Sequence, residues 1–284
     1  MKVSDLVTDP ATRAEGFESQ AAKKSELMKR YIDRGLQAIN ELQKSKKNFS
    51  DMSKELQDFF IAAAGLSRKS LQHLDQTTIE KIIMDILPMN DLSNSKVVND
   101  ILYRFLLTSG DALGGEMRNI IGDLGQTKLI EVFEDYSNNN KIKYEIKYSK
   151  SEKVSEFIWQ RQRIIFNKKP KFIDKSIDII VLKKDGDLEN PLDYLACGEL
   201  KSGIDPAGAD EHWKTAKSAL ARIRDNFNRR KIDPPYLFFI GAAIENSMAA
   251  EAVEMLKTGE LDFAANLYKE DHLEQMIKEI FALS

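Results

Sequence analysis

Apolar residues recur at helical spacing through the first hundred residues of the chain. One series consists of Leu27, Tyr31, Leu36, Ile39 and Leu42, and a second consists of Ile79, Ile82, Ile83 and Ile86. Pro88 closes the second series, and Ser50-Asp51 and Thr77-Thr78 are residue types that begin helices. No alternating pattern interrupts this region, so we expect helices from about residue 18 to residue 108.

The pattern changes in the second half, where short apolar or alternating runs predict strands. These runs are Lys143–Tyr148, Phe157–Phe166, Ile177–Leu182, Leu192–Lys201 and Tyr236–Ile240. Helical stripes follow after Pro206, around Met248–Lys257 and around Leu273–Phe281. Helices that bracket a mixed sheet indicate an α/β (α+β) domain over residues 109–284, preceded by a helical subdomain over residues 1–108.

A glycine-rich stretch, Ser109–Asn119, lies at that boundary. Three glycines around Asp111 predict a turn that opens onto a helix, with Arg118 in its first turns. Backbone N–H groups at such a helix start can bind a phosphate, but the spacing fits neither a P-loop nor a dinucleotide fingerprint. The favoured alternative is that the glycines allow close packing.

Composition excludes some classes of protein. No run of about 18 apolar residues is present, and Met1–Phe17 lacks the apolar core of a secretory signal. The single cysteine, Cys197, cannot form an internal disulfide, which favours a reducing, cytoplasmic compartment. The net charge is only −3, yet residues 141–175 hold eleven basic against four acidic side chains, and residues 214–231 hold seven against one. Such basic segments could line a groove that contacts the phosphates of a nucleic acid. The alternative is a solvated surface, which is what runs of charge usually form.

The candidate chemistry lies on two of the predicted strands. Asp178 is the one polar member of an apolar run, and a buried carboxylate needs a partner or a metal. Glu199 and Lys201 alternate with Leu200, so their side chains share a face. Mg²⁺ prefers oxygen ligands and few protein carboxylates, which Asp178, Glu199 and the Leu200 backbone carbonyl can supply. Lys201 would then stabilise charge on a scissile phosphate.

His212 follows at the start of a basic helix, where it could orient or deprotonate a water molecule. The plainer interpretations are that Glu199-Leu200-Lys201 is a surface ion pair and that His212 packs or caps a helix. A zinc site is not indicated, because three histidines and one cysteine lie scattered without ligand spacing. A cysteine nucleophile is not indicated either, since Cys197 lies in an apolar strand.

Three long segments resemble one family. They are SGDALGGEMRNIIGDLGQTKL (Ser109–Leu129), ELKSGIDPAGADEHWKTAKSALARIR (Glu199–Arg224) and FIGAAIENSMAAE (Phe239–Glu251). They closely resemble the AvaI/BsoBI family of type II restriction endonucleases, which is similar to other nucleases with a PD-(D/E)xK core. The resemblance spans roughly residues 101–266, and the N-terminal hundred residues match more loosely.

The resemblance implies a homodimer that encloses double-stranded DNA, requires Mg²⁺ and cuts a CYCGRG-like site to leave 5′ overhangs. A cytoplasmic, bacterial enzyme and a cognate methyltransferase in the host are implied as well. The helical subdomain would serve DNA enclosure and dimer contacts.

The motifs also carry individual roles onto this sequence. Asp178 resembles the family's metal-binding acid, and Glu199 and Lys201 match its ExK pair. His212 matches a histidine near the attacking water. Four residues are expected to contact DNA. Lys175 matches a lysine near the centre, and Asp205 resembles a base-reading aspartate. The other two are Lys214 of the basic helix and Arg118 of the glycine-rich stretch.

The sequence departs from the family's pattern in three places. The connection between Asp178 and Glu199 is shorter than in the family, and residues differ at two other points. Ile177 replaces the usual proline before the first acid, and Ser202-Gly203 replaces the glycine pair after the lysine. Two alternatives stay open: a structure-selective repair or recombination nuclease on the same core, and an inactive sequence-specific DNA-binding protein.

Overall fold

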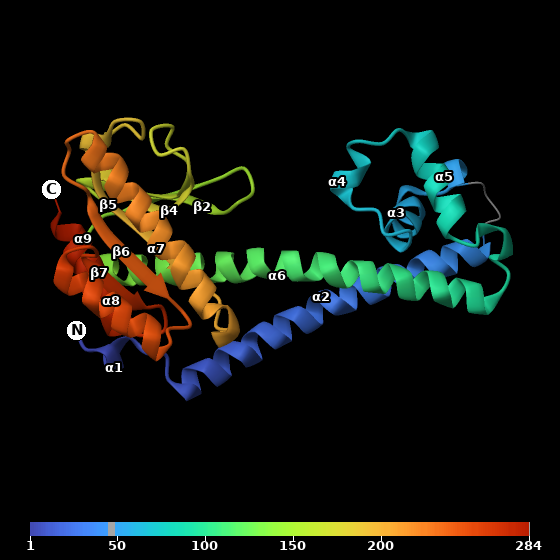
Figure 1. Ribbon diagram of the computed structural model, residues 1–284, viewed down its shortest axis with the longest axis horizontal. Coiled ribbons are helices and arrows are strands. Elements are labelled where there is room, and N and C mark those ends of the chain that lie inside the picture. Colours follow the sequence, from blue (N-terminus) through green and yellow to red (C-terminus); the bar gives the residue numbers. More distant parts are fainter. Residues whose placement is uncertain (45–48, 284) are drawn as a thin grey trace. The chain divides into compact units, whose positions relative to one another are not determined.

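The computed structural model describes residues 1–44 and 49–283 and divides into two compact units (Figure 1). One unit comprises residues 19–119, and the other comprises residues 1–18 together with residues 120–284. Two long helices, α2 (Pro10–Lys44) and α6 (Ser95–Asn139), continue from one unit into the other. None of the described helices combines the length and apolar character needed to cross a membrane.

The unit of residues 19–119 is helical, as the apolar spacing predicts. Besides parts of α2 and α6 it contains η1 (Phe49–Asp51), α3 (Lys54–Ala63), α4 (Arg68–Leu71), α5 (Gln76–Ile86) and η2 (Met89–Asp91). Its core includes Leu56, Phe60, Ile83, Ile101 and Phe105.

Two helix starts in this unit differ from the prediction. Ser53, not Ser50-Asp51, caps α3 by accepting a hydrogen bond from Leu56 N at 3.2 Å. Asp75 caps α5 through Thr78 N at 2.9 Å, so Thr77-Thr78 lies within the helix. In each case the capping oxygen comes from the residue directly before the first helical one, where it reaches an amide that lacks a partner in the helix.

The turn predicted over Ser109–Asn119 is wrong, because α6 runs through it unbroken. Positive backbone φ angles occur only at Gly65 and Gly259 among the described glycines, so Gly110, Gly114 and Gly115 keep helical geometry. Glycine permits a turn but does not impose one. The buried Met117 and Leu129 hold the helix in place on either side.

The other unit is built on a seven-stranded sheet with the order β1-β2-β3-β4-β5-β6-β7. Its strands are β1 (Glu145–Tyr148), β2 (Val154–Ile158), β3 (Gln162–Lys168), β4 (Ile177–Lys183), β5 (Tyr194–Lys201), β6 (Tyr236–Gly241) and β7 (Phe263–Asn266). Neighbours from β1 to β5 are antiparallel, and the pairs β5–β6 and β6–β7 are parallel. The expected α+β architecture, with a mixed sheet, flanking helices and a helical N-terminal region, is confirmed.

The strand prediction fails at two places. Phe157–Phe166 is not one strand but parts of β2 and β3, since Trp159 N donates to Gln162 O at 2.9 Å and closes a hairpin. The four residues of β7 form a strand that the pattern did not indicate, because FAAN is too short to show a period.

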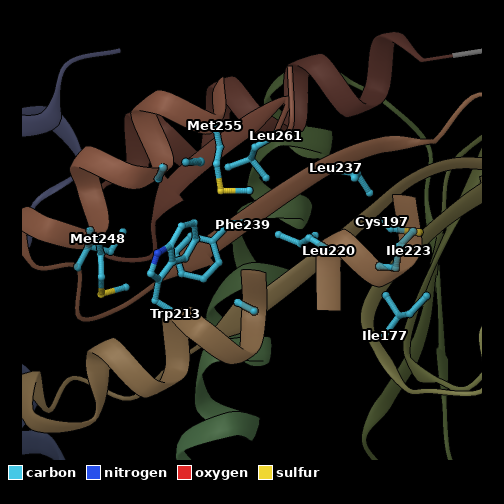
Figure 2. Close-up of a cluster of buried hydrophobic side chains, with 14 of the residues drawn as sticks. Ile177, Cys197, Trp213, Leu220, Ile223, Leu237, Phe239, Met248, Met255 and Leu261 are labelled. Atoms are coloured by element: carbon cyan, nitrogen blue, oxygen red, sulfur yellow. The ribbon is translucent and has the colours of Figure 1, made fainter. Parts of the chain in front are cut away.

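Helices cover both faces of the sheet. One face packs against α1 (Val3–Leu6), α7 (Pro206–Arg229) and α8 (Asn246–Thr258), and the other against α6 and α9 (Glu270–Ala282). On the first face Trp213 of α7 meets Phe239 of β6 edge to face at 4.9 Å between ring centroids (Figure 2). Burial of such large rings supplies much of the hydrophobic stabilisation, so α7 is firmly seated over the strands that carry the candidate site.

Candidate active site

Strands β4 and β5 bring Asp178 and Glu199 to the same end of the sheet. Their antiparallel register pairs Ile180 with Cys197 and Ile179 with Gly198, so the next opposed positions are Asp178 and Glu199. Ile180 and Cys197 belong to the core under α7 and α8, and side chains alternate between faces. Both carboxylates therefore project on the α7 side, as the sequence predicts for neighbouring strands.

Lys201 joins the two acids. Its Nζ donates to Asp178 Oδ2 at 2.9 Å and to Glu199 Oε2 at 2.7 Å. Asp178 Oδ2 also accepts a hydrogen bond from Leu200 N at 3.0 Å. The two carboxylates and the lysine thus form one connected cluster, which separates them from an ordinary surface ion pair.

Burial sets the electrostatics of this cluster. Glu199 is only 4% exposed, and the side chain of Lys201 is 21% exposed. Burial and the neighbouring Asp178 carboxylate raise the pKa of Glu199 to about 7, although Lys201 opposes the shift. Burial alone would lower the pKa of Lys201, but the carboxylates of Glu199 and Asp178 outweigh it and raise that pKa. Lys201 therefore stays charged, and it offsets the burial and mutual repulsion of the two carboxylates only in part.

The donor set fits a divalent metal ion. The carboxylates of Asp178 and Glu199 converge on the Lys201 ammonium. The N–H and C=O groups of one strand residue point to the same side, and Leu200 N donates to Asp178. The Leu200 carbonyl therefore also points towards β4. Within the described ranges no group of three or more His, Cys, Asp or Glu side chains could hold a metal. Two carboxylates with a carbonyl match Mg²⁺, which keeps several waters, better than they match zinc.

His212 lies on α7 and faces the loop that follows Lys201. A Cβ atom built on Gly203 or on Gly208 would lie 3.3 Å from His212 Nε2. The histidine is exposed, and in the described part of the chain no hydrogen bond joins its ring to Asp178, Glu199 or Lys201. The structure therefore brings three predicted residues into contact and leaves His212 beside them.

The four residues expected to contact DNA are exposed. Lys175 lies in the loop before β4, and Arg118 lies on α6 in the helical unit. Asp205 caps α7 by accepting from Ala207 N at 2.9 Å, and Pro206 begins the helix, as predicted. Lys214 pairs with Asp210 at 2.6 Å, and this contact raises the pKa of Lys214.

Sequence reasoning missed the residues that hold the loop after Lys201. Ser202 packs against Gly125 of α6, and Ile204 packs against Gly16 of α2. Gly125 lies within Ser109–Leu129, one of the three segments that resemble the family, but its contact depends on how α6 crosses the sheet. No local pattern encodes that crossing.

Comparison with known proteins shows where this site belongs. A family model described as "Restriction endonuclease BsobI" matches residues 1–283. The chain belongs to the BsoBI family of restriction endonucleases. It is 31% identical to the type II restriction enzyme BsoBI of Geobacillus stearothermophilus, over 98% of this chain and 95% of that protein. It is 38% identical to the type II restriction enzymes AvaI of Nostoc sp. and of Anabaena variabilis, over 78% of each chain.

Membership of the BsoBI family confirms the expected class. The chain is a site-specific deoxyribonuclease that acts on double-stranded DNA and uses a divalent metal ion. Asp178, Glu199 and Lys201, joined through the Lys201 ammonium, are the candidate residues for that reaction.

Proposed function

We propose that this chain is a homodimeric, Mg²⁺-dependent type II restriction endonuclease that cuts a CYCGRG-like site and leaves 5′ overhangs. The observation that carries the proposal is the partly buried cluster in which Lys201 Nζ contacts both Asp178 and Glu199. Family membership supplies the reaction, and the cluster supplies the groups that the reaction requires.

Each residue of the cluster has a separate task. Asp178, Glu199 and the Leu200 carbonyl would hold Mg²⁺, which would stabilise charge on the phosphoryl oxygens and activate water. Lys201, released from one or both carboxylates, donates to the scissile phosphate and stabilises its developing charge. His212 acts on the attacking water, through its orientation or as a base.

DNA contacts lie around this cluster. Lys175 and Lys214 neutralise phosphates on the catalytic unit, and Arg118 does so on α6. Asp205 reads a base edge, since a carboxylate can accept from the amino group of cytosine. We assign DNA enclosure and dimer contacts to residues 1–108 and catalysis to residues 109–284.

The remaining expectations follow from the proposed reaction. A pseudo-symmetric site suits a two-fold dimer in which each copy cuts one strand. The host needs a cognate DNA methyltransferase to protect its own sites, and the enzyme acts in the bacterial cytoplasm, where that DNA lies.

Cleavage of plasmid DNA tests the proposal. With Mg²⁺ the protein should yield discrete fragments whose ends share one sequence, and Glu199→Ala should yield none. Because Ca²⁺ supports binding without hydrolysis, Glu199→Ala should still bind the site in Ca²⁺. Loss of both binding and cutting would make Glu199 a structural residue.

Three other outcomes would replace the proposal. Random nicking, or no cutting at all, would exclude a restriction enzyme. Preferential cutting of branched junctions in a substrate panel would favour a structure-selective nuclease. Tight binding to one sequence without cleavage in Mg²⁺ or Mn²⁺ would favour an inactive DNA-binding protein.

A further inference from the structure

Alternate residues of the loop after Lys201 face opposite sides of the sheet, and Ser202 and Ile204 anchor the loop on the side away from α7. Ser202 is 9% exposed and Ile204 is fully buried, whereas Lys201 and Gly203 face the α7 side with His212. The backbone of Lys201 is fixed at this point as well, since its carbonyl accepts from Ala242 N at 2.8 Å. A short, tightly packed segment therefore connects the lysine of the site to the helix that carries His212.

Ser202 makes the closest of these contacts. A Cβ atom built on Gly125 of α6 would lie 1.8 Å from Ser202 Oγ and 2.5 Å from Ser202 Cβ. Both distances are far below van der Waals contact, so α6 reaches the loop only because residue 125 has no side chain. The Ser202 hydroxyl is buried there, and none of the described groups forms a hydrogen bond with it.

A second glycine packs closely against the same loop at Ile204, two residues after Ser202. A Cβ atom on Gly16 of α2 would lie 2.6 Å from Ile204 Cγ1. Gly16, Gly125 and the loop all belong to the unit of residues 1–18 and 120–284. The segment after Lys201 is thus bounded by helix backbone at two points.

The other α6 glycines show that this contact is specific. Gly110, Gly114 and Gly122 face nothing within 4 Å among the described residues, and Gly115 meets only Arg118 Nη2 at 4.0 Å, so an added methyl group would fit at each. Glycine inside a helix is unfavourable relative to alanine. Among the five glycines of α6, only Gly125 makes a contact that a methyl group would prevent.

We propose that Gly125 and Ser202 are positioning residues that set Lys201 against Asp178 and Glu199. The proposal rests on the function assigned above to Lys201. Ser202 is covalently next to Lys201, so any displacement of Ser202 shifts the lysine backbone. Lys201 Nζ lies 2.7 Å from Glu199 Oε2 and 2.9 Å from Asp178 Oδ2. A shift of the lysine backbone therefore also moves Nζ relative to the two acids and to the scissile phosphate that it is proposed to contact.

The test begins with Gly125→Ala, compared with Gly122→Ala on the same helix. Gly125→Ala should lower single-turnover cleavage by about 100-fold, the cost of a misplacement of roughly 1 Å at a reacting centre. Its Kd for site DNA in Ca²⁺ should change little, because Ser202 and Gly125 are buried and neither is among the proposed DNA contacts. Gly122→Ala should cut and bind like the wild type.

Substitutions of Ser202 then decide the mechanism. Ser202→Gly removes both clashing atoms, so Gly125→Ala/Ser202→Gly should recover the cleavage rate of Ser202→Gly alone. Ser202→Ala removes only the oxygen, so Gly125→Ala/Ser202→Ala should stay impaired. If Gly125→Ala is too unstable to purify, Gly125→Ala/Ser202→Ala, which has the smaller clash, takes its place.

Three results would overturn the inference. They are wild-type cleavage by Gly125→Ala, a parallel loss of cleavage and binding, and failure of Ser202→Gly to restore the rate. Failure of the proposed function itself would be recognised separately, because the wild-type protein would then give no discrete fragments.

Discussion

Glu199 faces two opposing demands. It must be ionised to bind a metal ion, yet it is nearly inaccessible to water and lies beside another carboxylate. Lys201 compensates for only part of this cost, so the pKa of Glu199 remains raised to about 7. Such a site destabilises the metal-free protein, and binding of a metal ion would offset that cost, because metal binding is coupled to folding.

The metal-free protein should therefore lose stability as the pH rises. The folded-state pKa of Glu199, about 7, exceeds its ordinary value of 4.5. The favourable contribution is therefore complete below about pH 4.5 and lost as the pH rises through about 7. In chelator, Glu199→Gln should exceed the wild type in unfolding free energy by on the order of 3 kcal/mol at about pH 8.5, and match it near pH 5.

Urea denaturation at the two pH values measures this difference. Glu254→Gln on the exposed face of α8 controls for the loss of a carboxylate elsewhere. Added Mg²⁺ should stabilise the wild type and not Glu199→Gln. A Gln variant that is less stable than the wild type at alkaline pH would show that Lys201 dominates the cluster.

Two parts of the cluster were predictable. A strand has a period of two, so Glu199 and Lys201 were expected on one face, and a lone acid in an apolar run marked Asp178 on a neighbouring strand. The placement of Asp178 opposite Glu199 depends on the register of β4 and β5. Neither the bridging position of Lys201 nor the contact of Ser202 with Gly125 was predictable. Both depend on how whole elements pack, which no short pattern records.

At the scale of elements, the start of α7 combines two tasks in one side chain. Asp205 caps the helix through Ala207 N and is also the proposed reader of a base. The cap was predictable, because Asp followed by Pro is a typical helix start. An experiment must separate the two tasks before a loss of activity can be interpreted.

Substitution of Asp205 by Asn and by Ala separates them. Asn keeps a capping oxygen, so Asp205→Asn should melt like the wild type, while Asp205→Ala should lose about 1 kcal/mol. If Asp205 reads a cytosine through an acceptor oxygen, Asp205→Ala should also lose about 1–3 kcal/mol of discrimination at that base pair, whereas Asp205→Asn keeps an acceptor. Thermal denaturation and cleavage of single-substitution sites measure the two effects. Wild-type discrimination in Asp205→Ala would leave Asp205 as a cap only.

Errors in the element prediction share a physical origin. The turn propensity of glycine predicts a break at Ser109–Asn119. Met117 and Leu129 are buried on either side, and their packing favours a continuous helix. Strand β7 was missed because four residues in a parallel pair depend on their neighbour β6 rather than on their own pattern. Tertiary context decided both cases.

At the scale of the whole molecule, the net charge does not indicate a DNA-binding protein. The chain carries −3 overall, and the basic side chains gather around residues 141–175 and 214–231. Attraction to DNA must therefore be local and depend on particular lysines and arginines. Affinity that arises in this way falls with salt, because each neutralised phosphate releases counterions.

Salt titration of DNA binding can test one such lysine. The logarithm of the binding constant in Ca²⁺ should fall linearly with the logarithm of salt concentration, and Lys175→Ala should reduce the slope by about 1. Lys175 is exposed in the loop before β4, and a phosphate contact there should weaken binding to all sequences alike. Lys257→Ala, on α8 in an exposed ion pair with Glu254, is the matched control and should leave the slope unchanged. Equal slopes for Lys175→Ala and the wild type would remove Lys175 from the DNA interface. A loss confined to one base pair would instead make Lys175 a base-reading residue, since phosphate contacts carry no sequence information.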